Sequence, residues 1–329
     1  MSSSNSISNV FILSLNRSGS TLLTSILNAH SKVIGLPESS FSLNLAIHFQ
    51  KANYTYDDYE EIVSVLWIRM RAFEKVWNLD KATLLKNLQK NKPQNVKEII
   101  QNIQLSYSPG KDIHCVVDKN PIYNHFIDLL NSTFENNKKI ILLRDYRDRF
   151  HSLTTQNQKI PYLKRLFHHF SWKVQVMKYL EIKRQSPSNV LFVKFEDLIC
   201  SLEATLKRIC EFIEIEFEEN MINNRFSAIP DFSSTIELAL KHQRSSHEFD
   251  LSQLNKVKYI STKDLKALHF FNSKVGSQFG YYSEIKLRVI EKVVIFLKHL
   301  PVLLIHNIFF WATRISYYLP MSLQKKLVR

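Results

Sequence analysis

Residues 11–30, FILSLNRSGSTLLTSILNAH, restrict the fold of this chain more than any other stretch. The apolar run at residues 9–15 is typical of a buried parallel strand. Residues 20–29 follow it with the spacing of an amphipathic helix, whose apolar face consists of Leu22, Leu23, Ile26 and Leu27. The polar loop between them therefore joins the end of a strand to the start of a helix. Such a loop exposes backbone N–H groups at the positive end of a helix dipole, which favours an anion.

The side chains of this loop favour an anion as well. Arg17 supplies a permanent positive charge that can bind oxyanions with two N–H groups, and Gly19 permits close approach of the backbone. Hydroxyl donors come from Ser18, Ser20 and Thr21. The loop lacks the lysine that follows glycine in nucleotide triphosphatase loops and reaches a γ-phosphate. The alternative interpretation is an ordinary polar helix cap formed by Ser18 or Ser20.

The rest of the chain predicts an α/β fold, because apolar strand patterns alternate with helical patterns up to about residue 213. Pro121 stands where a helix can begin. Residues 216–261 are polar and irregular, and we interpret them as a functional or capping loop region. The predicted strands are residues 9–15, 113–117, 139–143 and 189–193, and the predicted helices are residues 20–29, 56–77, 146–156, 162–184 and 202–213.

A second motif, IILLRDYRDRFHS at residues 140–152, combines a buried strand with a charged helix start. Arg144 falls at the carboxyl end of the strand, where open α/β sheets bind their ligands. Ser152 follows eight residues later, about two helical turns on. A solvated helix start would account for Arg147 and Arg149, but less well for Arg144.

The two motifs together, NRSGSTLL and LLRDYRDRFHS, resemble the paired signatures of sulfotransferases that use 3′-phosphoadenylyl sulfate (PAPS). The resemblance covers about residues 10–282 and implies a P-loop-type three-layer fold, with a mostly parallel central sheet flanked by helices. It implies that the first loop binds the 5′-phosphosulfate, where no γ-phosphate calls for a lysine. The implied cofactor-binding residues are Arg17, Ser18, Gly19, Ser20 and Thr21 for the 5′-phosphosulfate, and Arg144 and Ser152 for the 3′-phosphate.

Within that family, the chain is most similar to the tyrosylprotein-sulfotransferase-like branch and its bacterial relatives. RSGSTLLTSILNAHSKVIGLPE resembles the stretch that ends in the catalytic glutamate of that branch, which implies that Glu38 is the general base. VVDKNP resembles the motif that carries a catalytic lysine, here Lys119. KHQRSSHE resembles a segment whose serine contacts the sulfonate, here Ser245. VLFVKFEDLI places Phe195 where the branch has a tyrosine beside the adenine.

This resemblance implies an enzyme that transfers a sulfuryl group in line from PAPS to a hydroxyl, in preference to an amine. Arg17 and Lys119 would neutralise charge on the bridging oxygen, and Glu38 would take the proton of the acceptor. The segment after Glu38, SSFSLNLAIHF, lacks the basic residues that suit acidic tyrosine sites. The chain also has Gln156 where the family has a further basic residue, and it lacks a late Lys-Trp match. We therefore expect a glycan, lipid or other small acceptor.

Alternatives remain open for the activity and for the base. A P-loop-type kinase acting on a small molecule would share the fold and the first loop, and a membrane-associated nucleotide-binding protein without catalysis would keep only the nucleotide site. Because other sulfotransferase branches use histidine, His48, His114 and His125 are alternative bases. We interpret His168 and His169 as a surface feature of the helix at residues 162–184.

The C-terminal tail carries a large share of the positive charge. The whole chain has a net charge of +14, and residues 285–329 hold eight cationic residues against Glu291, a net of +7. Between Lys298 and Arg314 lie 15 residues without a formal charge, fewer than the roughly 18–20 apolar residues that cross a bilayer. Trp311 and the flanking cations suit an amphipathic helix on an anionic membrane surface. The alternative is a helix that packs on the domain or on a partner in a homodimer.

These observations predict a sulfotransferase domain at residues 8–283 and a basic amphipathic tail at residues 284–329. We expect no nucleic-acid partner, because no zinc-finger or RNA-binding signature is present. The three cysteines lack metal or redox spacing, which favours free thiols in a reducing compartment, and the histidines form no metal-ligand pattern. We expect no signal peptide and no metal, and a cytoplasmic enzyme that binds peripherally to the inner face of the membrane.

Overall fold

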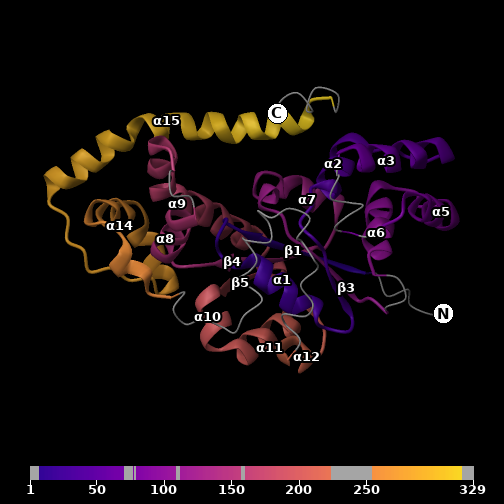
Figure 1. The fold of residues 1–329 in the computed structure, drawn as a ribbon, viewed down its shortest axis with the longest axis horizontal. Helices are drawn as coiled ribbons and strands as arrows, with labels where there is room; N and C mark the ends of the chain where they lie inside the picture. The colour runs from indigo at the N-terminus through magenta and orange to yellow at the C-terminus, as the bar shows by residue number, and fades with distance from the viewer. Residues whose placement is uncertain are drawn as a thin grey trace.

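The computed structural model describes residues 7–69, 77, 79–108, 112–156, 160–223 and 254–320. At its centre lies a five-stranded sheet in the order β2-β3-β1-β4-β5 (Figure 1). All four strand pairings are parallel, which confirms the predicted fold class. The strands are β1 (Ser8–Ser14), β2 (Val33–Gly35), β3 (Cys115–Asp118), β4 (Lys138–Leu143) and β5 (Val190–Lys194).

Most of the helices connect or cover these strands. Up to β4 they are α1 (Ser20–Asn28), α2 (Phe41–His48), α3 (Tyr56–Arg69), α5 (Lys81–Asn91), α6 (Val96–Ser106), η1 (Pro121–His125) and α7 (Ile127–Thr133). After β4 they are α8 (Tyr146–Gln156), α9 (Tyr162–Gln185), η2 (Pro187–Asn189), α10 (Phe195–Cys200), α11 (Leu202–Ile213), α12 (Asn220–Asn223), η5 (Lys256–Tyr259), α14 (Thr262–Gly276), η6 (Ser277–Phe279) and α15 (Val289–Tyr318).

Alternate residues of β1 face two different hydrophobic layers. Phe11 and Leu13 join the core shared with α2, α3, α6 and α9, whereas Val10 and Ile12 join the core shared with α1 and α11. Because both faces of the strand are covered, its sequence is an unbroken apolar run, as parallel strands usually are. The three-layer arrangement predicted from the sequence is confirmed, and Figure 1 shows α11 and α12 on the side of the sheet away from α15.

The four predicted strands and most of the predicted helices lie within one or two residues of their expected bounds. The predicted helices do not include α5, α6 or α14, and the sequence pattern does not reveal β2, which has only three residues and ends at Gly35. It also does not reveal α2, in which Phe41, Ser42, Leu43 and Asn44 are all buried. A helix buried on several sides lacks the polar stripe by which an amphipathic pattern is recognised.

The C-terminal helix α15 lies along the outside of the domain, where it contacts α9, α2 and α14 (Figure 1). One side of it faces the domain, with His299 and Val302 buried. Near its C-terminal end, His48 is hydrogen-bonded to the carbonyl oxygen of Tyr317 (2.9 Å), and Arg314 forms an ion pair with Asp128 (2.7 Å). One side of α15 therefore packs on the domain, as in the alternative interpretation of the tail.

The length of α15 differs from the sequence-based expectation. The helix has 30 residues, and by length and composition alone it is long and apolar enough to cross a membrane, with a mean hydropathy of 1.9 over its most apolar window. The 15 residues between Lys298 and Arg314 are fewer than the residues of the helix, because an apolar helix can continue past lysine and arginine side chains. Only 11% of that window is buried, so much of the apolar surface of α15 faces away from the domain.

Candidate active site

The loop after β1 has a backbone that few residues can adopt. Arg17 and Gly19 both lie in the left-handed region, with φ of +73° and +88°. A Cβ atom on residue 19 would lie 2.4 Å from the ring of Phe195, so glycine is required there for its space as well as for its φ. The loop thus turns sharply from the sheet into α1 with an aromatic ring closed over it.

The N-terminus of α1 fits an anion. Gly19 is the N-cap residue, and no side chain caps the helix. The alternative interpretation, in which Ser18 or Ser20 caps the helix, is therefore wrong. Ser18 is buried, and the side chains of Ser20 and Thr21 are partly exposed at the first turn. Free N–H groups, nearby hydroxyls and the helix dipole are together suited to phosphate or sulfate oxygens.

Arg144 is built into the same loop from the neighbouring strand. Its Nη1 donates a hydrogen bond to the carbonyl oxygen of Arg17 (3.1 Å), and its guanidinium lies 4.5 Å from the ring centroid of Phe195. Trp172 donates to the carbonyl oxygen of Arg144 (2.9 Å) and fixes the backbone there. Burial lowers the pKa of Arg144, while the carboxylates of Asp148 and Glu196 oppose that shift.

Ser152 completes this cluster, as the sequence predicts. Nε of Arg17 donates to Oγ of Ser152 over 3.1 Å, which joins the first loop to α8. Residues from the two motifs therefore meet at the carboxyl edge of β1 and β4. In this sheet β2 and β3 lie on one side of β1, and β4 and β5 lie on the other. Ligands of open α/β sheets bind in the crevice at the carboxyl end of such a strand, where the strand order reverses.

A second cluster, from β2 and β3, borders the start of α1. Lys119 forms an ion pair with Glu38 and lies 3.4 Å from Oγ1 of Thr21. Lys119 is only 4% exposed, whereas the side chain of Glu38 is 43% exposed. The amine is thus held in place beside the helix N-terminus, and the carboxylate remains accessible to a molecule from outside.

A family model described as the sulfotransferase family matches residues 9–219, more than half of the chain. The chain belongs to the sulfotransferase family. It is a transferase, and the activity that follows from its family is sulfuryl transfer. The match includes both clusters of the site and ends before α14 and α15.

Solved structures with the same fold are also sulfotransferases. The sulfotransferase domain of an olefin synthase from Synechococcus PCC 7002 has a TM-score of 0.55 and 22% identity, and the match covers 80% of this chain and 94% of that chain. The sulfotransferase domain from the curacin biosynthetic pathway has a TM-score of 0.51 and 22% identity, with coverage of 84% and 98%. Comparison with curated proteins finds no match.

Arg149 of this sulfotransferase differs from its interpretation as part of a solvated helix start. It is buried, and it donates to the carbonyl oxygen of Asn16 (3.0 Å) and to Oγ of Ser171 (3.4 Å). Burial lowers its pKa to about 10. Asn124 supports the same loop by donating to the carbonyl oxygen of Ser14 (2.8 Å). In the sequence, Arg149 follows Arg144 by five residues in the same charged segment, but only the fold reveals their different partners.

Asp118, immediately before Lys119, is a further site residue that the sequence analysis missed. Its carboxylate accepts hydrogen bonds from the hydroxyls of Tyr123 (2.7 Å) and Ser42 (3.1 Å). Burial raises its pKa to about 6, and the two hydroxyls oppose that shift. The carboxylate therefore ties the end of β3 to η1 and α2, and so fixes the backbone from which Lys119 projects. An acid at the carboxyl end of a buried strand was the available signal.

Glu196 was missed as well. Its carboxylate accepts from the backbone N–H of Asp145 (2.9 Å) and from the hydroxyl of Tyr281 (2.8 Å). Burial raises the pKa of Glu196. These contacts tie the residue after Arg144 to the segment that follows α14, beyond the match to the family model.

Several of the histidines have structural partners. His125 is stacked on Phe310 with centroids 4.9 Å apart, which places this alternative base, like His48, under α15. The expectation that His168 and His169 are surface residues is wrong: they are 8% and 3% exposed. His169 bridges Asp264 of α14 and His299 of α15, each over 2.9 Å. A buried histidine pair within a basic helix gives no sequence signal that separates it from an exposed one.

The remaining expectations concern Ser245, His114 and metals. Ser245 lies outside the described residues. His114 directly precedes β3, and its backbone N–H donates to the carbonyl oxygen of Lys32 (3.0 Å). Within the part of the chain that the structure describes, no group of three or more histidine, cysteine or acidic residues could hold a metal ion.

Proposed function

We propose that this sulfotransferase transfers a sulfuryl group from PAPS to the hydroxyl of a glycan, lipid or other small acceptor. One observation carries the proposal. Arg144 and Ser152 both hydrogen-bond to Arg17 in the loop before the uncapped N-terminus of α1, and Lys119, which is paired with Glu38, contacts Thr21 in the first turn of α1. Groups for holding an anion and groups for moving a proton thus border the same helix terminus.

The fit of PAPS to these residues rests on the loop. Arg17 and Gly19 have positive φ angles, and a side chain on residue 19 would fill the space against Phe195. The 5′-phosphosulfate would lie against Arg17, Gly19 and Thr21, with the 3′-phosphate near Arg144 and Ser152. When bound, PAPS supplies a sulfuryl group whose leaving group is the 5′-phosphate.

The residues of the chain would then act by position and charge. Glu38 accepts the proton of the acceptor hydroxyl as its oxygen forms the new bond to sulfur. Lys119, buried beside Thr21, and Arg17 stabilise negative charge on the oxygen that leaves as the old S–O bond breaks. The ion pair with Lys119 holds the Glu38 carboxylate in position before the acceptor enters. As in phosphoryl transfer, most of the rate enhancement would come from positioning and electrostatics.

Ligand-induced thermal stabilisation tests this proposal against the alternative of a kinase that binds ATP. We expect 3′-phosphoadenosine 5′-phosphate (PAP) to raise the melting temperature, because a ligand at 100 times its Kd stabilises a protein by about 2.7 kcal/mol. ATP with Mg²⁺ should give little shift, since residue 20 is serine where triphosphatase loops have lysine. A shift with ATP and none with PAP would contradict the proposal and favour the kinase.

The acceptor class is open to a direct assay. Radiolabelled sulfate from PAPS is incubated with the enzyme and a whole-cell extract, and the extract is fractionated into lipid, glycan and protein. We expect the label in the lipid or glycan fraction. PAP binding without label in any fraction would favour a nucleotide-binding protein without catalysis.

We also propose that α15 places the enzyme on an anionic membrane surface. Its outward side exposes large apolar residues along its whole length, namely Val289, Ile290, Val293, Val294, Phe296, Leu297, Leu304, Ile308, Trp311 and Ile315. Lys286, Arg288 and Lys292 lie at its N-terminal end, where they would meet anionic lipid headgroups. The opposite side packs on the domain, which supports a helix that lies in the interface. A cytoplasmic enzyme at the inner face of the membrane follows from this proposal.

A further inference from the structure

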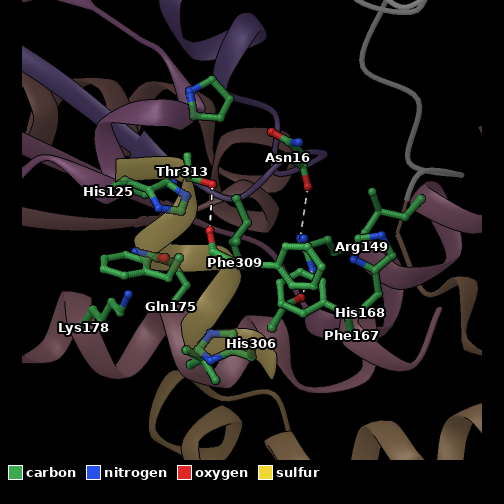
Figure 2. A pocket seen from close by; sticks show the side chains of 17 residues that line it. Asn16, His125, Arg149, Phe167, His168, Gln175, Lys178, His306, Phe309 and Thr313 are labelled. Atoms are coloured by element: carbon green, nitrogen blue, oxygen red, sulfur yellow. Dashed lines mark hydrogen bonds between the residues drawn. The ribbon is translucent and has the colours of Figure 1, made fainter. Parts of the chain in front are cut away.

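A cavity of about 340 Å³ lies between α9 and α15, beside the first loop (Figure 2). Leu15 and Asn16 of the loop form one wall, and Phe309 and Phe310 of α15 form another. The volume falls within the range of sites that bind small molecules. The wall formed by α15 lies beyond the residues that match the family model.

Most of the surface that lines the cavity is apolar, although polar side chains and two cations also border it. Phe167, Val174 and Leu153 line it together with the phenylalanines of α15, and no aspartate or glutamate is among the lining residues that the structure describes. The two cations at its edge already have contacts. Arg149 donates to Asn16, and the amine of Lys178 lies 3.6 Å from the ring centroid of Phe310. The remaining space therefore suits an apolar molecule with few polar groups.

Among the described residues that line the cavity, His168 has two buried ring nitrogens without a hydrogen-bond partner, whereas His125 and Gln175 each have one such nitrogen, Nδ1 and Nε2. The residue His168 is 8% exposed. Burial lowers its pKa to about 3, and the nearby Arg149 contributes to this shift. The ring is therefore neutral and offers one N–H donor and one acceptor. Figure 2 shows it beside Phe167 and Arg149 at the cavity. A ligand oxygen would satisfy it.

We propose that this cavity holds the chain of a single-chain lipid alcohol, with an oxygen of that lipid hydrogen-bonded to His168. The inference rests on the proposed function and names its acceptor class. A sulfuryl acceptor needs a free hydroxyl, and the cavity shares Asn16 with the loop, next to Arg17. A lipid with an ester oxygen between its chain and its hydroxyls matches three features: the largely apolar surface, the unpartnered imidazole of His168 and the adjacent anion loop.

Equilibrium dialysis of radiolabelled 1-monodecanoylglycerol, below its micelle concentration and with PAP present, tests the inference without relying on turnover. We expect saturable binding to the full-length enzyme, tightening roughly fourfold for each methylene added between the hexanoyl and decanoyl esters. Decanoate serves as the anionic comparison and should bind more weakly. No saturable binding of the ester, or tighter binding of decanoate, would overturn the inference.

Variants locate the bound chain. Val174→Trp fills the cavity and should abolish saturable binding, and Thr313→Trp, on the α15 wall, should weaken it if the first variant does not fold. His168→Phe keeps the apolar volume and should weaken binding roughly 2- to 12-fold, the range of one net hydrogen bond. Ile308→Trp, on the outer side of α15 and 65% exposed, is the control and should bind normally.

Two outcomes separate this inference from the proposed function. PAP binding is measured by melting temperature in the same samples. If PAP does not stabilise the enzyme, the proposed function fails, whatever the lipid does. If PAP stabilises it but the Ile308 variant alone loses the lipid, the lipid binds to the outer side of α15 and the inference fails by itself.

Discussion

Arg144 shows how one side chain can unite two motifs that are 127 residues apart. Its guanidinium binds the carbonyl oxygen of Arg17 and lies on the ring of Phe195, and that ring in turn covers Gly19. The sequence predicts that Arg144 and Arg17 both bind the nucleotide, but not that each holds the other in position. Loss of one residue should therefore affect the binding of both ends of the nucleotide.

Replacing Arg144 tests that coupling. We expect Arg144→Ala to weaken PAP binding by about 1.5–3 kcal/mol, the usual worth of a hydrogen bond to a charged group. Isothermal titration calorimetry measures the change. Arg144→Lys should restore only part of the affinity, because an ammonium lacks the planar fork. The control is Arg184→Ala, whose side chain is 76% exposed. Unchanged affinity in the alanine variant would remove Arg144 from the nucleotide site.

Glu38 is the residue on which turnover should depend. Glu38→Gln removes the proton acceptor but keeps a side chain that can bind Lys119. We expect sulfuryl transfer to fall by about 10²–10⁴, the typical contribution of a general base, with PAP affinity nearly unchanged. Sulfuryl transfer by Glu38→Gln is compared with that of the control variant Glu203→Gln, because the side chain of Glu203 is 55% exposed. Retained turnover would show that another group, or none, takes the proton.

Asp118 should give the stability of the enzyme a distinct pH dependence. Its pKa in the folded protein is about 6, against 3.8 for an unperturbed aspartate. Between these values the folded state binds more protons than the unfolded state, so this residue lowers the stability as the pH rises from about 4 to 6. We expect the melting temperature of the wild type to fall over this range relative to Asp118→Asn. Parallel curves for the two proteins would contradict this.

At the scale of elements, the sequence predicts most of those that carry a regular apolar pattern, although α6, which buries Ile99, Ile100 and Ile103, is not among the predicted helices. β1, β4, α8, α9 and α11 each carry a regular apolar repeat, and the structure has them within one or two residues of the predicted bounds. The short β2 and the buried α2 lack such a repeat, because their conformation depends on the strands and helices around them. The site divides in the same way.

The linear motifs contain Arg17, Arg144, Glu38 and Lys119, so those residues could be found by eye. The buried roles of Arg149 and His168 depend on packing against the first loop and α15, which no local pattern encodes. The roles proposed from the motifs, and the boundary between residues 283 and 284, stay predictions.

The two sides of α15 can be tested separately. Leu304 and Ile308 are 68% and 65% exposed, so replacing both with glutamate changes the outer side without disturbing the packed one. We expect each substitution to weaken the binding of the double variant to anionic vesicles at least tenfold, as measured by flotation. Burying such a side chain in the membrane contributes about 1.5 kcal/mol or more to binding. The control is Leu163→Glu on α9, 55% exposed. Equal flotation of all three proteins would exclude α15 as the membrane contact.

At the scale of the whole molecule, the net positive charge favours anionic partners, and the C-terminal helices are joined to the domain that contains the site. A net charge of +14 attracts polyanionic ligands and anionic surfaces from a distance and loses much of that effect at high salt. Helices α14 and α15, beyond the family match, are joined to the domain by buried polar contacts, among them the bridge from Asp264 through His169 to His299. The C-terminal segment is thus part of the folded unit around the site.

The position of β1 between β3 and β4 has a consequence for hydrogen exchange at its backbone amides. Its backbone amides are hydrogen-bonded to neighbours on both edges, so Phe11, Ile12 and Leu13 can exchange their hydrogens with solvent only when the sheet itself comes apart. The edge strand β2 can open by itself. The anion loop therefore follows a central strand, whereas Glu38 follows a strand at the edge of the sheet, so we expect the amides of β1 to exchange more slowly than those of β2.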